Sequence, residues 1–423
     1  MEDIRVSTLM MQKNEKVLLE KWIKYHKEIV GLDNITIFDN GSTNDETINI
    51  LKKYEKSGLK VIWTHNTQKD FELKGTILGN EILALQESSN YDFFFPLDCD
   101  EFLAVELENS KISCEKEDIF AELKKYVGSK DILMIKKQLF NSPISDEWFW
   151  PRPDRKCFFY RNNFLSMDVG FHWAKNVHST TELQTKIVQF HFHNKPYSVA
   201  QEHAKAKLLS RVDNFSLETL RNYKGAGVHL VDYFLFSESE IVNNLLNKKY
   251  TPCEALKYKF AELDIAWPYA DEIAQSCHRV NEARAEICHG MGIDAEVQHK
   301  QIMSSVDRVE LIGSTLRLIG WGFGIMHDKK VSEIKSMAMV IDNKCVIGNI
   351  EARSSRDDVR AVHSIAPEDA GYVVNFDTSN LKIHKEGIKS ISLFMDIKSR
   401  SLGQIIQFNK VSKIVSLLND KSK

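Results

Sequence analysis

The sequence predicts an α/β domain followed by an all-β domain, and two changes of pattern along the chain indicate this. Residues 1–210 begin with short apolar runs that alternate with amphipathic helical stretches, which is typical of a mostly parallel sheet covered by helices. Residues 211–303 carry long helical patterns, and residues 304–423 return to short β-type runs separated by Gly, Asn, Asp and Ser. We therefore expect an α/β domain, a helical extension and an antiparallel β-sandwich, since 423 residues exceed what one core holds.

The composition is that of an ordinary soluble protein, and it disfavours several classes. Hydrophobic residues make up 43% and charged residues 27%, and 56 basic against 59 acidic side chains leave no positive excess for nucleic acid. No apolar stretch reaches the roughly 20 residues that span a bilayer, and the first residues lack a secretory-signal pattern. With seven cysteines and no CxxC pair, we expect free thiols and a cytoplasmic protein.

The strands of the first domain are predicted from nearly continuous apolar runs, because parallel strands covered on both faces carry few polar residues. A helix follows the first run, with Leu18, Trp22 and Tyr25 on one face and Gly31 at its end. The five predicted strands lie at residues 4–11, 34–39, 59–65, 91–98 and 131–140.

Two further helices are predicted between these strands. Asn40-Gly41 forms a turn, and Thr43 with Glu46 fits a capping box at the start of the next helix. Another helix is expected over residues 72–88. Strands and helices thus alternate through the first domain.

Acidic residues follow two of the predicted strands. Asp39 closes the second strand, and Asp98, Asp100 and Glu101 follow the fourth in the segment FFFPLDCDEFLAV. Parallel sheets bind ligands at the carboxyl ends of their strands, so both groups face one crevice if their strands are close in the sheet. Such carboxylates suit Mg²⁺ or Mn²⁺. The alternative, solvated turn acids or a helix cap, fits less well because apolar residues flank the acids, and clustered carboxylates repel one another without a cation.

Four segments in a fixed order carry a resemblance to a known family: LMMQKNE, LLEKWIKYH, IFDNGSTNDET and PLDCDEFL. Over residues 4–210 the chain resembles the glycosyltransferase family 2 group with the GT-A fold, a Rossmann-like and mostly parallel architecture, and especially its branch related to family 92. The C-terminal β runs resemble the β-sandwich appendages found beside bacterial glycosyltransferases. The resemblance implies a hexosyltransferase that uses a nucleotide-sugar, with UDP expected, and Mn²⁺ or Mg²⁺.

The resemblance implies roles for individual residues of the donor site. Asp39 contacts the nucleotide base, and Asn14 and Glu15 line the same pocket. Asp98 approaches the ribose or the metal, and Asp100 binds the cation held on the donor's diphosphate.

Further groups are expected to complete the donor site. Related enzymes carry a histidine after the last core strand that completes the metal shell, and KIVQFHFH is the match, with His191 and His193 on one face of a strand. The alternative for each histidine is an ordinary polar-face residue. Glu101 is expected to bind the cation through water or to orient its loop. Lys156 is expected to neutralise phosphate, unless it is simply solvated.

The resemblance leaves the catalytic base open, because this stretch departs from the family-2 pattern of an acidic pair beyond the metal motif. An inverting transferase needs a carboxylate base on the acceptor side. Trp148 and Trp150 are expected to stack on acceptor sugars, or else to pack into the core with Phe149, and His172 is a further acceptor-side candidate. The candidate bases are Asp146, Glu147, Asp154 and Asp168.

Three classes of function follow from these patterns. The leading one is a metal-dependent, inverting glycosyltransferase that acts on a glycan or lipid-linked glycan in bacterial surface polysaccharide, capsule or lipopolysaccharide synthesis. The second is a catalytically inactive carbohydrate-binding or scaffolding protein, against which the intact Asp39, Asp98 and Asp100 argue. The third is another nucleotide-sugar enzyme or a glycoside hydrolase, which needs its acids about 5 to 10 Å apart across a cleft. Peripheral membrane association at the inner face and homo-oligomerisation are left open.

Overall fold

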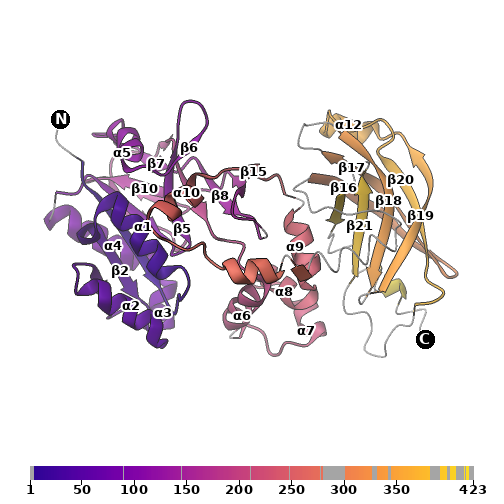
Figure 1. The fold of residues 1–423 in the computed structure, drawn as a ribbon, viewed down its shortest axis with the longest axis horizontal. Coiled ribbons are helices and arrows are strands. Elements are labelled where there is room, and N and C mark those ends of the chain that lie inside the picture. The colour runs from indigo at the N-terminus through magenta and orange to yellow at the C-terminus, as the bar shows by residue number, and fades with distance from the viewer. Residues whose placement is uncertain are drawn as a thin grey trace. The chain divides into compact units, whose positions relative to one another are not determined.

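The computed structural model divides the chain into two compact units (Figure 1). The first comprises Met1–Asn194 and Thr251–Ala270, and the second comprises Lys195–Tyr250 and Asp271–Lys423. The residues that the structure describes are 4–88, 90–143, 145–209, 211–246, 248–276, 278–279, 301–325, 331–341, 344–381, 391–397, 401–405, 414 and 416–418.

The first unit is built on a seven-stranded sheet in the order β13-β7-β10-β4-β1-β2-β3. The neighbours β4, β1, β2 and β3 are parallel, whereas β10 runs antiparallel to β4. The predicted parallel sheet is therefore confirmed for these four strands, and antiparallel pairing extends it. The strands are β1 (Val6–Gln12), β2 (Ile35–Asp39), β3 (Lys60–Ile62), β4 (Phe93–Leu97), β7 (Ile132–Met134), β10 (Cys157–Tyr160) and β13 (Glu182–Gln184).

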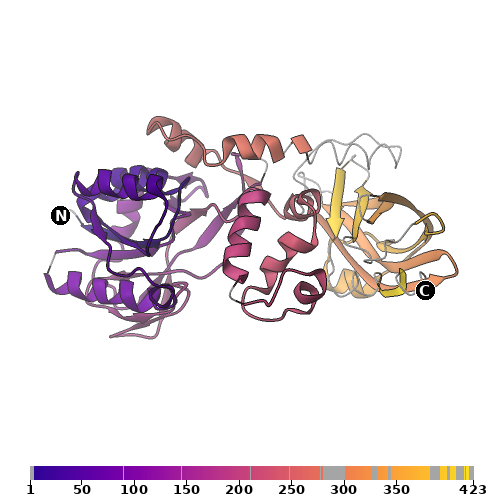
Figure 2. The ribbon, with the colours of Figure 1, turned by 90° about the horizontal axis from the view of Figure 1, so that it is seen from below.

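Helices lie on both sides of this sheet (Figure 2). On one side, Leu78 and Ile82 of α4 share a buried cluster with Leu9 of β1 and Phe38 of β2. The helix predicted over 72–88 is confirmed as α4, and a short helix that was not predicted, α3, precedes it. The helices of this part are α1 (Leu19–Val30), the 3-10 turn η1 (Leu32–Asn34), α2 (Asp45–Glu55), α3 (Gln68–Glu72), α4 (Lys74–Ser88) and α5 (Lys116–Lys124).

The start of α2 differs from the sequence prediction. Its N-cap is Asn44, whose side-chain oxygen accepts a 3.1 Å hydrogen bond from the backbone N–H of Thr47. The predicted capping box of Thr43 and Glu46 is therefore wrong, and Thr43 belongs to the loop that precedes the helix. A capping box with Glu46 would need Thr43 as the N-cap, one position before Asn44, which is the N-cap in the structure.

The first unit also contains a six-stranded sheet in the order β15-β9-β8-β14-β5-β6. The apolar run 131–140, predicted as one strand, is divided between β7 and β8, because the backbone changes partners between them. Ile135 N donates to Lys156 O, and Lys136 N donates to Ile187 O. The strands are β5 (Glu101–Glu106), β6 (Ile112–Ser113), β8 (Lys137–Asn141), β9 (Trp148–Arg152), β14 (Ile187–His191) and β15 (Thr251–Pro252), besides the separate pair β11 (Phe164–Met167) and β12 (Ala174–Asn176).

One face of the second sheet is apolar, and the segment after β15 covers it. Phe260 of α10 (Ala255–Glu262) lies 5.4 Å from Phe102, and Trp267 lies 5.2 Å from Phe192, measured between ring centroids. Aromatic pairs at these distances bury large apolar areas. This segment therefore belongs to the first unit, although the sequence pattern places it in the helical extension.

The second unit contains short helices and an antiparallel sheet. The described C-terminal strands form one hydrogen-bonded sheet in the order β16-β17-β20-β19-β18-β21-β22, with β17 also paired to β18, and a two-sheet sandwich stays a prediction. No helix among the described residues is long and apolar enough to cross a membrane. The elements are α6 (Tyr197–Leu208), α7 (Leu217–Asn222), η2 (Val228–Val231), α8 (Asp232–Leu235), α9 (Glu238–Leu246), β16 (Gln301–Ile312), β17 (Thr315–Ile325), β18 (Val331–Ile341), β19 (Lys344–Ser354), α12 (Asp357–Val362), β20 (Gly371–Asp377), β21 (Ile391–Ile397) and β22 (Ser401–Ile405).

Candidate functional site

The carboxyl ends of β2, β1 and β4 lie side by side, because β1 is hydrogen-bonded to both neighbours in a parallel register. Asp39 ends β2, Asn14 and Glu15 follow β1, and Asp98 and Asp100 follow β4. The structure thus brings the residues predicted for the donor site to one edge of one sheet. This is the edge at which parallel sheets bind ligands.

Asp39 is buried, and protein donors already bind its carboxylate. Oδ1 accepts hydrogen bonds from Gln12 Nε2 at 2.6 Å and from Ser42 Oγ at 2.5 Å, and Oδ2 accepts one from Ser42 N at 2.8 Å. The side chain is 3% exposed. Asp39 therefore fixes the loop after β2, whatever else it binds.

Asn14 fixes the same loop from the other side. It has a left-handed backbone, with φ at 55°, and its side-chain oxygen accepts hydrogen bonds from Thr43 N at 2.8 Å and Asn44 N at 3.0 Å. Asparagine tolerates this conformation better than most residues. Glu15 lies beside it, and its Oε1 accepts a 3.4 Å bond from Leu18 N.

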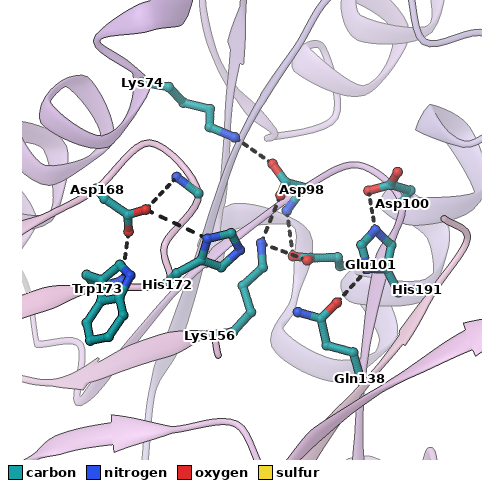
Figure 3. A network of polar contacts seen from close by, with 11 residues as sticks. Lys74, Asp98, Asp100, Glu101, Gln138, Lys156, Asp168, His172, Trp173 and His191 are labelled. Atoms are coloured by element: carbon teal, nitrogen blue, oxygen red, sulfur yellow. Dashed lines mark hydrogen bonds and ion pairs between the residues drawn. The ribbon is translucent and has the colours of Figure 1, made fainter. Parts of the chain in front are cut away.

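Two of the acids after β4, Asp98 and Glu101, form ion pairs with lysines (Figure 3). Lys74 Nζ lies 2.6 Å from Asp98 Oδ1, and Lys156 Nζ lies 2.9 Å from Asp98 Oδ2 and 2.8 Å from Glu101 Oε1. The side chains of Lys74, Lys156 and Glu101 are 7%, 4% and 0% exposed, whereas Asp98 is 30% exposed. Glu101 Oε2 also accepts a 2.9 Å bond from Asp98 N, so Glu101 orients the turn that carries the acids.

These ion pairs set the charge of the cluster. Burial opposes ionisation of Asp98, but the ammonium groups of Lys74 and Lys156 hold its pKa well below the usual range. Burial likewise opposes a charged Lys156, but Glu101 and Asp98 raise its pKa well above the usual value. The counter-charge that the clustered acids require is therefore supplied by the chain itself.

Sequence reasoning missed Lys74. The signal was present, because Lys74 precedes Leu78 and Ile82 by four and eight positions, which places it on the buried face of α4. Gly75 lets this end of the helix approach the 167–168 backbone: a Cβ atom there would lie 2.6 Å from Asp168 O.

Asp100 faces His191. The distance from Asp100 Oδ1 to His191 Nε2 is 3.5 Å, and the other ring nitrogen, Nδ1, lies 2.5 Å from Gln138 Oε1 (Figure 3). Both nitrogens thus face oxygen acceptors, so either the ring is protonated or a cation lies beside Nε2. Burial opposes protonation of His191, but the Asp100 carboxylate raises its pKa.

His193, Trp148 and Trp150 lie in or beside the strands of the second sheet near His191. The strand register places Glu101, His191, Phe140 and Trp150 in one row. His193 follows β14 and stacks on Phe140, with 4.6 Å between ring centroids.

Trp148 lies on the same face of β9 as Trp150, since side chains two positions apart share a face. Arg152 lies 4.8 Å from the Trp150 ring centroid, so a cation covers part of this aromatic surface. Phe149 points to the opposite face, where it packs 4.7 Å from Phe190. Of these three aromatic residues, Phe149 is the one that packs into the core.

Two of the four candidate bases, Asp146 and Glu147, share one lysine partner. Lys257 Nζ binds Asp146 Oδ2 at 3.1 Å and Glu147 Oε1 at 2.5 Å, and the second oxygen of each has no partner among the described residues. Asp154 gives both oxygens to Arg152, at 3.0 and 2.9 Å.

Asp168 serves the turn between β11 and β12. Its Oδ1 accepts a 2.8 Å bond from Trp173 N, its Oδ2 accepts a 3.3 Å bond from Gly170 N, and His172 Nδ1 lies 3.8 Å from Oδ2. His172 is thereby held at the turn that carries Asp168 (Figure 3).

The residues fit a divalent cation in a limited way. No group of three or more His, Cys, Asp or Glu side chains in the described part of the chain is arranged to hold a metal ion. Asp100 and His191 form a two-residue donor set, and Gln138 Oε1 holds the orientation of the ring through Nδ1, as an acceptor on the far nitrogen of a metal-binding histidine does. Two protein ligands are enough for a cation that takes its remaining ligands from a diphosphate and water. Asp98 fits less well, since lysines bind both of its oxygens.

Comparisons with known proteins give weak matches. No protein-family model and no curated protein matches the sequence. Matching solved structures include TarS of S. aureus, with 11% identity over 95% of this chain and 77% of that chain and a TM-score of 0.28, and TarS 1–349 with UDP, with 13% identity over 74% and 96% and a TM-score of 0.25. A cytidylyltransferase from Leptospira borgpetersenii has 13% identity over 31% of this chain and 54% of that chain, at a TM-score of 0.21. Similarity this low does not assign a function.

Proposed function

We propose that the chain is a glycosyltransferase that moves a sugar from a nucleotide-sugar, with UDP as the expected nucleotide, to a glycan or lipid-linked glycan of the bacterial surface. The observation that carries this proposal is the meeting of Asp98, Asp100, Lys74, Lys156 and His191 where parallel strands end. Carboxylates and buried ammonium groups together suit a ligand that carries phosphates with a bound cation.

The chemistry requires positive charge at the departing nucleoside diphosphate. Lys74 and Lys156 place two ammonium groups at the edge of the sheet, and these would stabilise the charge that develops on the leaving phosphate. Asp100 and His191 would hold Mn²⁺ or Mg²⁺, which acts as a Lewis acid on the diphosphate when it is bound. Asp39 and Asn14 hold the loop after β2, where the nucleotide base of the donor is expected to bind.

An inverting transfer also needs a base for the acceptor hydroxyl. Asp146 and Glu147 suit this role better than Asp154 or Asp168, because one carboxylate oxygen of each has no partner in the described part of the chain and can accept a proton. Lys257 orients both carboxylates through their other oxygens.

A donor panel tests the proposed function. UDP-, GDP- and CMP-sugars would be screened by thermal shift with and without Mn²⁺, because a ligand that binds only the folded state raises Tm. We expect a UDP-sugar to stabilise the protein, and Mn²⁺ to increase the effect. Stabilisation by glycans but by no nucleotide-sugar would instead support the carbohydrate-binding alternative.

The metal assignment has its own test. Asp100→Asn keeps the size of the side chain but removes a charged ligand, and it should abolish the Mn²⁺-dependent part of the shift. Asp154→Asn is the control, because Asp154 binds Arg152 outside the cation site. An unchanged Mn²⁺ effect in Asp100→Asn would refute the assignment.

A further inference from the structure

Phe171 has a conformation that bulky residues rarely adopt. Its φ is 59°, in the left-handed region, and its side chain is 0% exposed. Non-glycine residues are rare in this region because the conformation is strained, so neighbouring contacts must hold Phe171 there. Asp168 O accepts a 3.2 Å bond from Phe171 N, and Phe171 O accepts a 2.9 Å bond from Cys157 N.

The ring that this conformation places is in contact with both lysines of the site. Lys74 Nζ lies 4.5 Å from the Phe171 ring centroid, and Lys156 Nζ lies 5.0 Å from it. These are cation–π distances. The two ammonium groups contact Asp98 on one side and the Phe171 ring on the other. Lys74 belongs to α4, and Lys156 immediately precedes β10.

An aromatic ring holds a cation without using one of its N–H donors or cancelling its charge. Lys74 has one hydrogen-bonded partner among the described residues, Asp98, and its other contacts are the faces of Phe71 and Phe171. Two of its three N–H groups are thus left for an anion. A carboxylate in place of Phe171 would neutralise the lysines, and an aliphatic side chain would not attract them.

We propose that Phe171 is a positioning residue, which holds the ammonium groups of Lys74 and Lys156 in place for the diphosphate of the donor. This inference rests on the proposed function for the identity of the ligand. It assigns the strain at Phe171 to the binding of phosphate rather than to the stability of the fold.

Three variants separate this role from ordinary packing. Phe171→Leu removes the ring but keeps an apolar side chain, and Phe171→Tyr keeps the ring. Phe164→Leu is the matched control: Phe164 is 2% exposed, belongs to the same buried cluster, and packs its ring against Phe159 with 4.8 Å between ring centroids. Circular dichroism and Tm would confirm that each variant folds.

Binding of UDP, uridine and inorganic pyrophosphate would be measured by calorimetry. We expect Phe171→Leu to weaken the binding of UDP and of pyrophosphate about tenfold, because two cation–π contacts are lost. The binding of uridine should stay unchanged. Phe171→Tyr and Phe164→Leu should bind UDP like the wild type. Equal UDP affinity in Phe171→Leu and the wild type, or an equal loss for UDP and uridine, would overturn the inference.

Pyrophosphate distinguishes failure of the inference from failure of the proposed function. A wild type that binds pyrophosphate but no nucleotide would refute the nucleotide-sugar proposal, and the effect of Phe171→Leu on pyrophosphate would then decide the role of Phe171. A wild type that binds neither would refute both.

Discussion

The ammonium group of Lys156 lies 2.9 Å from Oδ2 of Asp98, a residue 58 positions earlier in the chain. This contact joins the start of β10 to the turn after β4, and Glu101 Oε1 shares the same ammonium at 2.8 Å. The side chains of Lys156 and Glu101 are 4% and 0% exposed. Charges buried to this degree depend on their partners far more than exposed charges do.

Lys156→Met should therefore destabilise the protein strongly. It leaves the buried Glu101 without a counter-charge, and loss of one partner of a buried ion pair typically costs about 3 to 5 kcal/mol. Urea denaturation measures the free energy of unfolding. The double variant Lys156→Met/Glu101→Gln should recover much of the loss, because it removes the uncompensated charge.

An exposed ion pair provides the control for this prediction. Lys53 lies 2.7 Å from Glu20, with 65% and 35% of their side chains exposed. Lys53→Met should cost less than about 1 kcal/mol. Similar losses of stability in Lys156→Met and Lys53→Met would show that the buried ion pair of Lys156 and Glu101 contributes no more to stability than a surface pair.

The pH dependence of stability should carry the signature of His26. Burial lowers its pKa to about 3. Its Nδ1 lies 3.0 Å from Trp22 O, and its Nε2 accepts a 3.5 Å bond from Leu103 N, which fits a neutral ring. In the unfolded chain the histidine takes up a proton below about pH 6.5, but in the folded chain it does so only near pH 3. Its contribution to stability is therefore full above pH 6.5 and falls by up to about 1.4 kcal/mol per pH unit below it.

The variant His26→Gln isolates this term. Glutamine offers a hydrogen-bond donor and an acceptor but does not titrate. The free energy of unfolding of the variant should therefore fall less steeply than that of the wild type between pH 6.5 and pH 4. The difference between wild type and variant should narrow as the pH falls. Parallel pH profiles would contradict a buried neutral His26.

Gly75→Ala should destabilise the protein although alanine favours helices. The new Cβ would lie 2.6 Å from Asp168 O and 2.8 Å from Met167 O, both backbone atoms that cannot rotate away. Overpacking of this kind costs about 1 to 3 kcal/mol. In Gly79→Ala, on the same helix, the new Cβ would meet the Phe164 ring at 2.7 Å, a side chain that can shift. A thermal melt should therefore show the larger loss for Gly75→Ala, and the reverse order would contradict the close backbone contact.

The proposed cation site predicts that Gln138→Leu weakens the binding of Mn²⁺ in the presence of UDP by about 10- to 100-fold, because a hydrogen-bonded partner keeps a metal-binding histidine in its orientation. The variant removes the acceptor at His191 Nδ1 and frees the ring to change tautomer and orientation. The measurement is the Mn²⁺ concentration that gives half of the UDP-dependent thermal shift.

Gln189→Leu is the matched control for this substitution. Gln189 is buried, pairs with Gln138 in the strand register, and neither of its amide atoms has a hydrogen-bond partner among the described residues. Its replacement by leucine should leave Mn²⁺ binding unchanged and stability equal or higher. Equal effects of the two leucine variants would remove the special role of Gln138.

Much of the first sheet could be predicted from the sequence, because its strands are apolar runs that identify themselves locally. The positions of Asp39 and Asp98 at strand ends follow directly from those runs. The division of residues 131–140 could not be predicted, since it depends on hydrogen bonds to Lys156 and Ile187 from elsewhere in the chain. The cap at Asn44 was missed for a related reason, because Asn14, a distant residue, holds Thr43 in the loop.

By itself, the sequence determined the alternation of strands and helices and the placement of acids after β4, because period and polarity are local properties of a chain. Only the tertiary structure decided what neutralises those acids. Lys74 and Lys156 reach Asp98 from separate elements, and Phe171 reaches both lysines through a turn whose backbone no local pattern specifies. Electrostatic pairing depends on distance in space, and the fold alone brings residues so far apart in the chain within 3 Å of one another.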